Sequence, residues 1–175
     1  MMRPLTRKDP QELRRELQDS NSESLSRRRR IIGASLVGMA AMGAVSLLQT
    51  GMIRHLPDPP LPGFDSDKVN SSDTAYALGM PDGTLSVASF AGNLPLAAWG
   101  GADRARTMPW LPVAIAGKAL IEAAVAAWYF YQMPAKEKAW CGYCITGAAM
   151  NVTIAALALP EARTAIRALR GDIES

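Results

Sequence analysis

The sequence predicts an all-α integral membrane protein, a four-helix bundle with a long outer loop that contains a short helix. Its 175 residues are 49% hydrophobic and 20% charged, which suits one domain. The charged residues are unevenly spread, because a polar, basic N-terminal tail is followed by long apolar runs. A helix needs about 20 mostly apolar residues to cross the hydrocarbon core of a bilayer. Four segments of about that length follow the tail, and we expect each to span the membrane.

The four predicted spans differ in how apolar they are. The first is free of charge, the second contains Asn93 and Pro95, and the third carries Lys118 and Glu122. A proline is tolerated in a span when neighbouring helices satisfy the carbonyl that it frees. The spans are expected at residues 31–53, 84–101, 109–133 and 141–159.

Arginine and lysine residues set the expected orientation. Residues 1–30 form a polar, basic tail that ends in four consecutive arginines beside the first span. Basic residues favour the cytoplasmic side, so we expect a multi-pass protein of the inner (cytoplasmic) membrane with both termini in the cytoplasm. The membrane domain covers residues 31–160, and residues 161–175 form a cytoplasmic C-terminal segment. Because the basic residues cluster beside apolar runs, the net charge of +3 indicates membrane orientation and not nucleic-acid binding.

The outer loop, residues 54–83, connects the first two spans. Its first part holds several prolines, which favour a stiff and extended path. Ser71, Ser72 and Asp73 are candidate caps of a short helix that ends near Gly79. Such a helix would close over the outer ends of the bundle. The alternative is a solvated connector.

Two cysteines separated by two residues form the strongest chemical feature of the sequence. Cys141 and Cys144 are its only cysteines, and they stand at the mouth of the fourth span. The helix dipole and unpaired N–H groups favour a thiolate at a helix start. We interpret the pair as redox-active. The alternatives are two inert buried thiols and a metal site shared between chains, because His55 is the only histidine and a metal site within one chain is not expected.

Two motifs follow one another along the predicted membrane domain. One is the loop run of residues 69–83, Val-Asn-Ser-Ser-Asp-Thr-Ala-Tyr-Ala-Leu-Gly-Met-Pro-Asp-Gly. The other is Cys141-Gly-Tyr-Cys144-Ile-Thr, followed by Asn151-Val. In these motifs the chain resembles the vitamin K epoxide reductase family, and the resemblance covers residues from about 31 to 160.

The resemblance implies a four-helix bundle around a quinone pocket that opens toward the membrane and is capped by the loop. The quinone would be menaquinone, ubiquinone or a similar molecule, and a dithiol and a quinone would react to give a disulfide and a quinol. The resemblance further implies that Cys144 engages the quinone as a thiolate and that Cys141 exchanges disulfides. Ser72 would support the loop near the site. Asn93 and Asn151 are candidate hydrogen-bond donors across helices and candidate quinone contacts.

The loop departs from the family pattern. Members usually carry a second cysteine pair in this loop, and Ser66 stands where one of those cysteines is expected. A loop relay is therefore excluded, and a thiol partner such as a periplasmic thioredoxin-like protein would reach Cys141 directly. The alternative is a family member that has lost catalysis and serves as a structural or quinone-binding subunit of a membrane complex.

Lys118 and Glu122 are four residues apart in the third span, so they share a helix face and can pair. Each such charge at membrane depth costs about 2.5–3.5 kcal/mol by insertion scales unless it faces protein or water. One interpretation is a proton route or a polar wall of the pocket. The other is a mutually neutralised pair that serves only packing.

Overall fold

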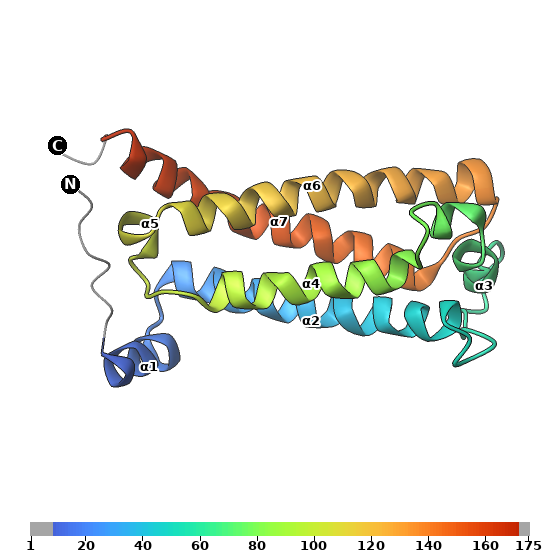
Figure 1. The fold of residues 1–175 in the computed structure, drawn as a ribbon, viewed down its shortest axis with the longest axis horizontal. Helices are drawn as coiled ribbons and strands as arrows, with labels where there is room; N and C mark the ends of the chain where they lie inside the picture. The colour runs from blue at the N-terminus through green and yellow to red at the C-terminus, as the bar shows by residue number, and fades with distance from the viewer. Residues whose placement is uncertain (1–8, 172–175) are drawn as a thin grey trace.

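The computed structural model describes residues 9–171 and shows an all-helical bundle, which confirms the predicted fold class. Four long helices run along the same axis (Figure 1). The ends of the predicted tail and of the predicted C-terminal segment, residues 1–8 and 172–175, lie outside the described residues. The long helices are α2 (Glu23–Gln49), α4 (Asp82–Ala98), α6 (Trp110–Gln132) and α7 (Gly142–Leu169).

Short helices close the two ends of the bundle. At one end lie α3 (Ser66–Asn70), the 3₁₀ turn η1 (Asp73–Tyr76) and the π turn η2 (Met133–Glu137). At the other end lie α1 (Pro10–Asp19) and α5 (Arg104–Thr107). We call these the disulfide end and the α5 end. The last turns of α7 lie at the α5 end together with α1 (Figure 1).

Three of the described helices are long and apolar enough to cross a membrane: α2, α6 extended by η2, and α7. The fourth, α4, has 17 residues and spans about 26 Å at 1.5 Å per residue, slightly less than the hydrocarbon thickness. The protein is therefore a multi-pass membrane protein with three or four spans, and a lipid bilayer surrounds it.

The helix boundaries differ from the predicted spans at several places; α7, for example, continues to Leu169, past the predicted end at residue 159. Helix α2 begins at Glu23, because the Ser22 hydroxyl accepts the Leu25 N–H and arginines are good helix formers, so the four arginines lie inside the helix. Helix α4 ends at Ala98, earlier than residue 101, because Trp99 is extended and Gly100 has a φ of +80°.

The predicted short helix of the loop is present as the 3₁₀ turn η1, which ends at Tyr76, and a second short helix, α3, precedes it outside the predicted range. Asp65 caps α3 by accepting the Lys68 N–H at 2.9 Å. Ser72, one of the three candidate caps, stands at the N-cap position of η1, yet its hydroxyl caps nothing and donates to the Val69 carbonyl at 2.8 Å. Gly79, where the helix was expected to end, has a φ of +74° and turns the chain toward α4.

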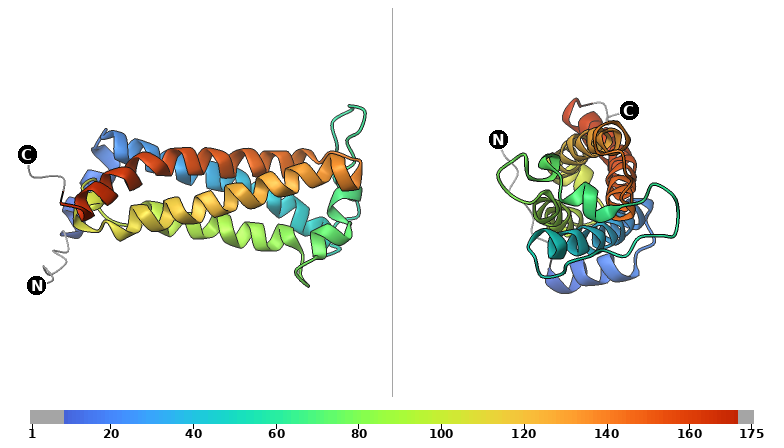
Figure 2. Two further views of the ribbon diagram at one scale, coloured as in Figure 1. Left: turned by 90° about the horizontal axis from the view of Figure 1, so that it is seen from above. Right: turned by 90° about the vertical axis from the view of Figure 1, so that its right-hand side faces the viewer.

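The core lies where the four long helices meet. Ile31, Phe90, Ile115 and Ile154 come one from each helix and are each at most 2% exposed. Helix α4 packs mainly along α2, and α6 packs mainly along α7 (Figure 1, and Figure 2 in the end-on view). Gly38 allows α2 to pack closely against α4, because a Cβ at that position would stand 2.5 Å from the Phe90 ring.

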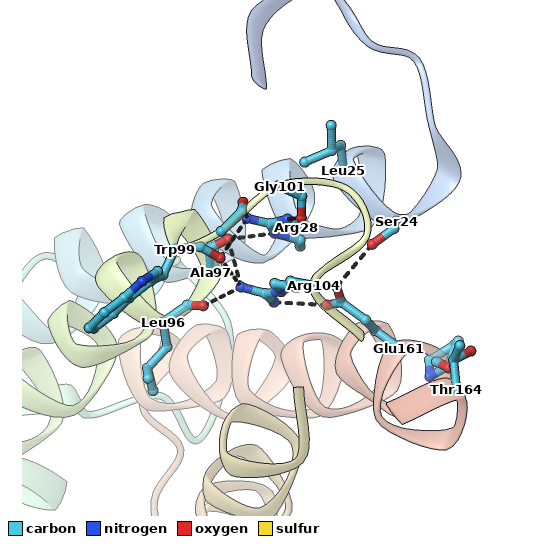
Figure 3. Close-up of polar contacts among 12 residues, drawn as sticks. Ser24, Leu25, Arg28, Leu96, Ala97, Trp99, Gly101, Arg104, Glu161 and Thr164 are labelled. Carbon is cyan, nitrogen blue, oxygen red and sulfur yellow. Dashed lines mark hydrogen bonds and ion pairs between the residues drawn. The ribbon is translucent and has the colours of Figure 1, made fainter. Parts of the chain in front are cut away.

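Two arginines close the α5 end of α4 (Figure 3). The Arg28 guanidinium donates to the carbonyls of Ala97, Gly101 and neighbouring residues at 2.7–3.0 Å. Arg104, fully buried, pairs with Glu161 through two bonds of 2.8 and 2.9 Å and also donates to the Leu96 carbonyl. Carbonyls at a helix C-terminus carry partial negative charge, which compensates the excess of positive charge in this cluster.

Candidate functional site

The two cysteines form a disulfide at the start of α7. Cys141 is the N-cap residue, with extended backbone, and Cys144 lies in the first turn, so their Cα atoms are 5.3 Å apart. The backbone N–H of Cys144 donates to Cys141 Sγ at 3.1 Å. Cys141 is fully buried, whereas Cys144 is partly exposed. The two sulfurs of one bond therefore face different surroundings.

A segment of the outer loop covers Cys141. Its residue Phe64 forms a parallel β-bridge with Trp140, which directly precedes Cys141. Two backbone bonds make the bridge, from Trp140 N–H to the Gly63 carbonyl at 2.8 Å and from Asp65 N–H to the Trp140 carbonyl at 2.9 Å. The loop is therefore fixed to the chain directly before the buried Cys141.

Ser66 occupies the position expected for a loop cysteine, and it anchors the loop through hydrogen bonds. Its hydroxyl donates to one oxygen of Asp58 at 2.5 Å, and its N–H donates to the other at 2.8 Å. Ser66 is fully buried. These two hydrogen bonds to Asp58 thus hold the loop at Ser66, a position that has no thiol in this chain.

Asn70 contacts both cysteines, and sequence reasoning did not single it out. Its side-chain Nδ2 lies 3.2 Å from Cys141 Sγ, and its Oδ1 lies 3.4 Å from Cys144 Sγ. The same Nδ2 donates to the Ser66 carbonyl at 2.7 Å, one helical turn earlier. Asn70 belongs to the loop motif of residues 69–83, but nothing in the spacing of that motif distinguishes it from the other polar residues.

A cavity of about 430 Å³ begins at Cys144 and is walled by the long helices, the loop and η2. Ligand pockets in proteins commonly measure about 300–1,000 Å³ and are mostly apolar with a few polar groups. Cys144, Ser72 and Asn151, predicted as site residues, all line it, whereas Cys141 does not. Most of the wall is apolar, with Met42, Val45, Phe90, Val125, Ala148 and similar residues.

The third predicted contact, Asn93, lies outside the cavity wall. It is fully buried, and its Oδ1 accepts a hydrogen bond from Lys118 Nζ at 2.7 Å. Lys118 also donates to the Ser89 carbonyl at 2.7 Å and pairs with Glu122 at 2.5 Å. This cluster joins α4 to α6, and its members Ser89 and Glu122 line the cavity. Of the two interpretations of the Lys118–Glu122 pair, this placement favours a polar wall of the pocket.

The bundle, the disulfide and the apolar cavity define a class: a helical membrane protein with a CxxC redox motif at the mouth of a ligand-sized pocket. The sequence profile of the vitamin K epoxide reductase family matches residues 29–159. The chain therefore belongs to the vitamin K epoxide reductase family, as its motifs indicated, and it lacks the loop cysteine pair. Members of this family are membrane thiol–quinone oxidoreductases. No curated protein and no solved structure matches the chain.

Proposed function

We propose that the protein is a thiol–quinone oxidoreductase of the inner membrane that oxidises a dithiol to a disulfide through Cys141 and Cys144. The observation that carries the proposal is that the two cysteines of the pair face different surroundings. Cys144 lines the cavity, and Cys141 lies under the loop at the end of the bundle. One disulfide therefore connects a lipid-soluble oxidant with an aqueous thiol. Both termini would be cytoplasmic, with the disulfide on the oxidising side.

The cavity fits a quinone by the chemistry of its wall. A quinone ring is flat and apolar and carries two carbonyl acceptors, so it needs an apolar slot with few donors. The Asn151 amide offers N–H donors, whereas the Ser72 hydroxyl hydrogen is already given to the Val69 carbonyl. Asn151 would thus orient the quinone, and the Ser72 oxygen would accept from a quinol hydroxyl.

The reaction is balanced without a further reactant. Two thiols lose two electrons and two protons as the S–S bond forms. The quinone takes up the two electrons and the two protons and becomes a quinol. The disulfide then exchanges with the thiols of a partner, the proposed periplasmic thioredoxin-like protein. Because the loop has no cysteines, that partner must exchange with the CxxC itself.

The test is anaerobic quinone reduction by the purified protein, with a dithiol as donor and with menaquinone and ubiquinone analogues compared. We expect turnover in the wild type and in the exposed loop variant Ser71→Ala, and none in Cys141→Ser or Cys144→Ser. Turnover that persists in both cysteine variants, or none in folded wild-type protein, would contradict the proposal.

A second candidate function is a structural or quinone-binding subunit of a membrane complex. Two observations favour it: Ser66 replaces a relay cysteine, and Cys141 is fully buried. Quinone binding without turnover, together with a stable partner subunit after purification in mild detergent, is the result that this candidate predicts. Turnover that depends on the cysteines excludes it.

A further inference from the structure

We infer that Glu122 distinguishes the reduced from the oxidised ligand of the cavity: its carboxylate accepts a hydrogen bond from a ring hydroxyl of the quinol and repels a quinone carbonyl. This inference rests on the proposed quinone site and deepens it. It assigns a residue to the end of the cavity away from the disulfide, and it favours one direction of electron flow.

The neighbouring Lys118 has no hydrogen left for a ligand. Its Nζ donates to the Ser89 carbonyl at 2.7 Å, to Asn93 Oδ1 at 2.7 Å and to Glu122 Oε1 at 2.5 Å. An ammonium group has three hydrogens, so these three acceptors take all of them. Lys118 therefore holds the Glu122 carboxylate in place and does not itself donate to the ligand.

The Glu122 carboxylate has one occupied and one unoccupied oxygen. Lys118 and the Ser89 hydroxyl both donate to Oε1. Oε2 is buried and has no hydrogen-bond partner within the described residues 9–171. A carboxylate accepts hydrogen bonds at both oxygens, and a buried acceptor without a donor is destabilising. The last torsion of a glutamate is soft, so this oxygen can turn toward a donor that enters the cavity.

Glu122 belongs to the cavity wall, at the end away from the disulfide. Its partner Ser89 also lines the cavity and lies about 10 Å along α4 from Asp82, the wall residue with which that helix begins at the disulfide end. Asn151 lies about 10 Å along α7 from Cys144, which is a similar depth. The cavity is thus polar at both ends, which suits the two oxygens on opposite edges of a quinone ring.

The oxidation state of the ligand decides which of these groups it satisfies. A quinone carbonyl only accepts hydrogen bonds, so it suits the Asn151 amide but repels the oxygens of the Glu122 carboxylate. A quinol hydroxyl both donates and accepts, so it can donate to Glu122 and accept from Asn151. A hydrogen bond to a charged group is stronger than one between neutral groups. The cavity therefore binds the quinol more tightly than the quinone.

Tighter binding of the quinol drives the proposed reaction in one direction. The reaction itself is unchanged: the S–S bond forms, two electrons and two protons leave the dithiol, and the quinone takes them up and becomes the quinol. Each tenfold difference in affinity raises the two-electron reduction potential of the bound quinone by about 30 mV. Glu122 therefore makes the bound quinone a stronger oxidant of the cysteine pair than the same quinone free in the membrane.

The test measures binding and needs neither thiols nor turnover. Two redox-inert probes, 2-methyl-1-naphthol and its methyl ether, are titrated into the full-length protein in detergent at neutral pH and followed by calorimetry. Only the naphthol has a hydroxyl hydrogen. We expect the wild type to bind the naphthol about tenfold to a hundredfold more tightly, the range for a hydrogen bond to a charged group. Equal affinities overturn the inference.

Variants assign the preference to its residue. In Glu122→Gln the side-chain oxygen stays on Lys118 and Ser89, and an NH₂ group replaces Oε2, so the preference for the hydroxyl should disappear. Because this change leaves Lys118 without a counter-charge, the uncharged pair Lys118→Met/Glu122→Gln is measured as well and should behave alike. Glu137→Gln is the matched control and should keep the preference, because Glu137 also lines the cavity but already accepts from the Thr74 hydroxyl at 2.8 Å. A preference that survives both changes of Glu122, or that Glu137→Gln abolishes equally, contradicts the inference.

These outcomes are separate from those of the proposed function. A hydroxyl preference that depends on Glu122, in a protein without turnover, supports this inference and contradicts the oxidoreductase. Cysteine-dependent turnover without such a preference supports the oxidoreductase and overturns this inference.

Discussion

Breaking the buried ion pair at the α5 end should destabilise the whole bundle. Arg104 is fully buried and Glu161 is 5% exposed, and two hydrogen bonds of 2.8 and 2.9 Å join them (Figure 3). In Arg104→Met the Glu161 carboxylate loses both bonds, and the Leu96 carbonyl loses its 2.6 Å donor. Removing one partner of a buried pair typically costs about 3–5 kcal/mol, because the other charge is left uncompensated.

The double variant Arg104→Met/Glu161→Leu should recover part of this loss, since no buried charge remains. The Ala97 and Trp99 carbonyls still receive Arg28, so few acceptors are left without a donor. We expect the double variant to be at least 1 kcal/mol more stable than the sum of the two single changes predicts, in the range of coupling energies for residues in contact.

The assay is unfolding in a mild detergent, followed by far-ultraviolet circular dichroism, with the free energies compared in a double-mutant cycle. Arg106→Met, an exposed arginine on the same short helix, is the control and should stay within about 0.5 kcal/mol of wild type. A loss of unfolding free energy below about 1 kcal/mol in Arg104→Met, or simple additivity in the cycle, would contradict the stabilising role of the Arg104–Glu161 pair.

Two further predictions concern the packing of α2 and the charge of the loop. Gly38→Ala should destabilise the bundle by about 1–3 kcal/mol because the new Cβ meets the Phe90 ring at 2.5 Å, whereas Gly33→Ala, with open space at its Cβ, should be neutral or stabilising in the same unfolding assay. The hydrogen bond with Asp67 raises the pKa of His55 above its usual 6.5, so this contact stabilises the loop fully below pH 6.5 and is lost as pH rises through the raised pKa. A histidine NMR titration should show the pKa of His55 falling in Asp67→Asn; an unchanged value would refute the assigned cause.

The helical fold was largely predictable, because the length and apolar content of a segment already favour a membrane helix. The end of α4 was not. It depends on Gly100 in a left-handed conformation and on the Arg28 guanidinium, which binds the last carbonyls from 69–73 residues away in sequence. The second predicted span therefore extended past Ala98, where the helix stops.

The candidate site, too, was predictable from the sequence only in part. Cys141 and Cys144 are three positions apart at the start of one helix, so their spacing alone predicts that their sulfurs can bond. The placement of Asn93 depends on Lys118 of another helix, and the structure turns it away from the cavity toward that lysine. Asn151 and Ser72 line the cavity together, although one belongs to α7 and the other to the loop.

What the sequence by itself determined are the properties of single segments: apolar length, the basic residues at the ends of the spans, the CxxC at a helix start and the membership in its family. Those properties depend on neighbours along the chain, so they can be deduced without a structure. Only the tertiary structure decided which groups surround the sulfurs. Asn70 and Cys141 are 71 residues apart, and hydrogen bonds act over about 3 Å, so the chemistry of the cysteine pair depends on a packing of helices and loop that no local pattern specifies.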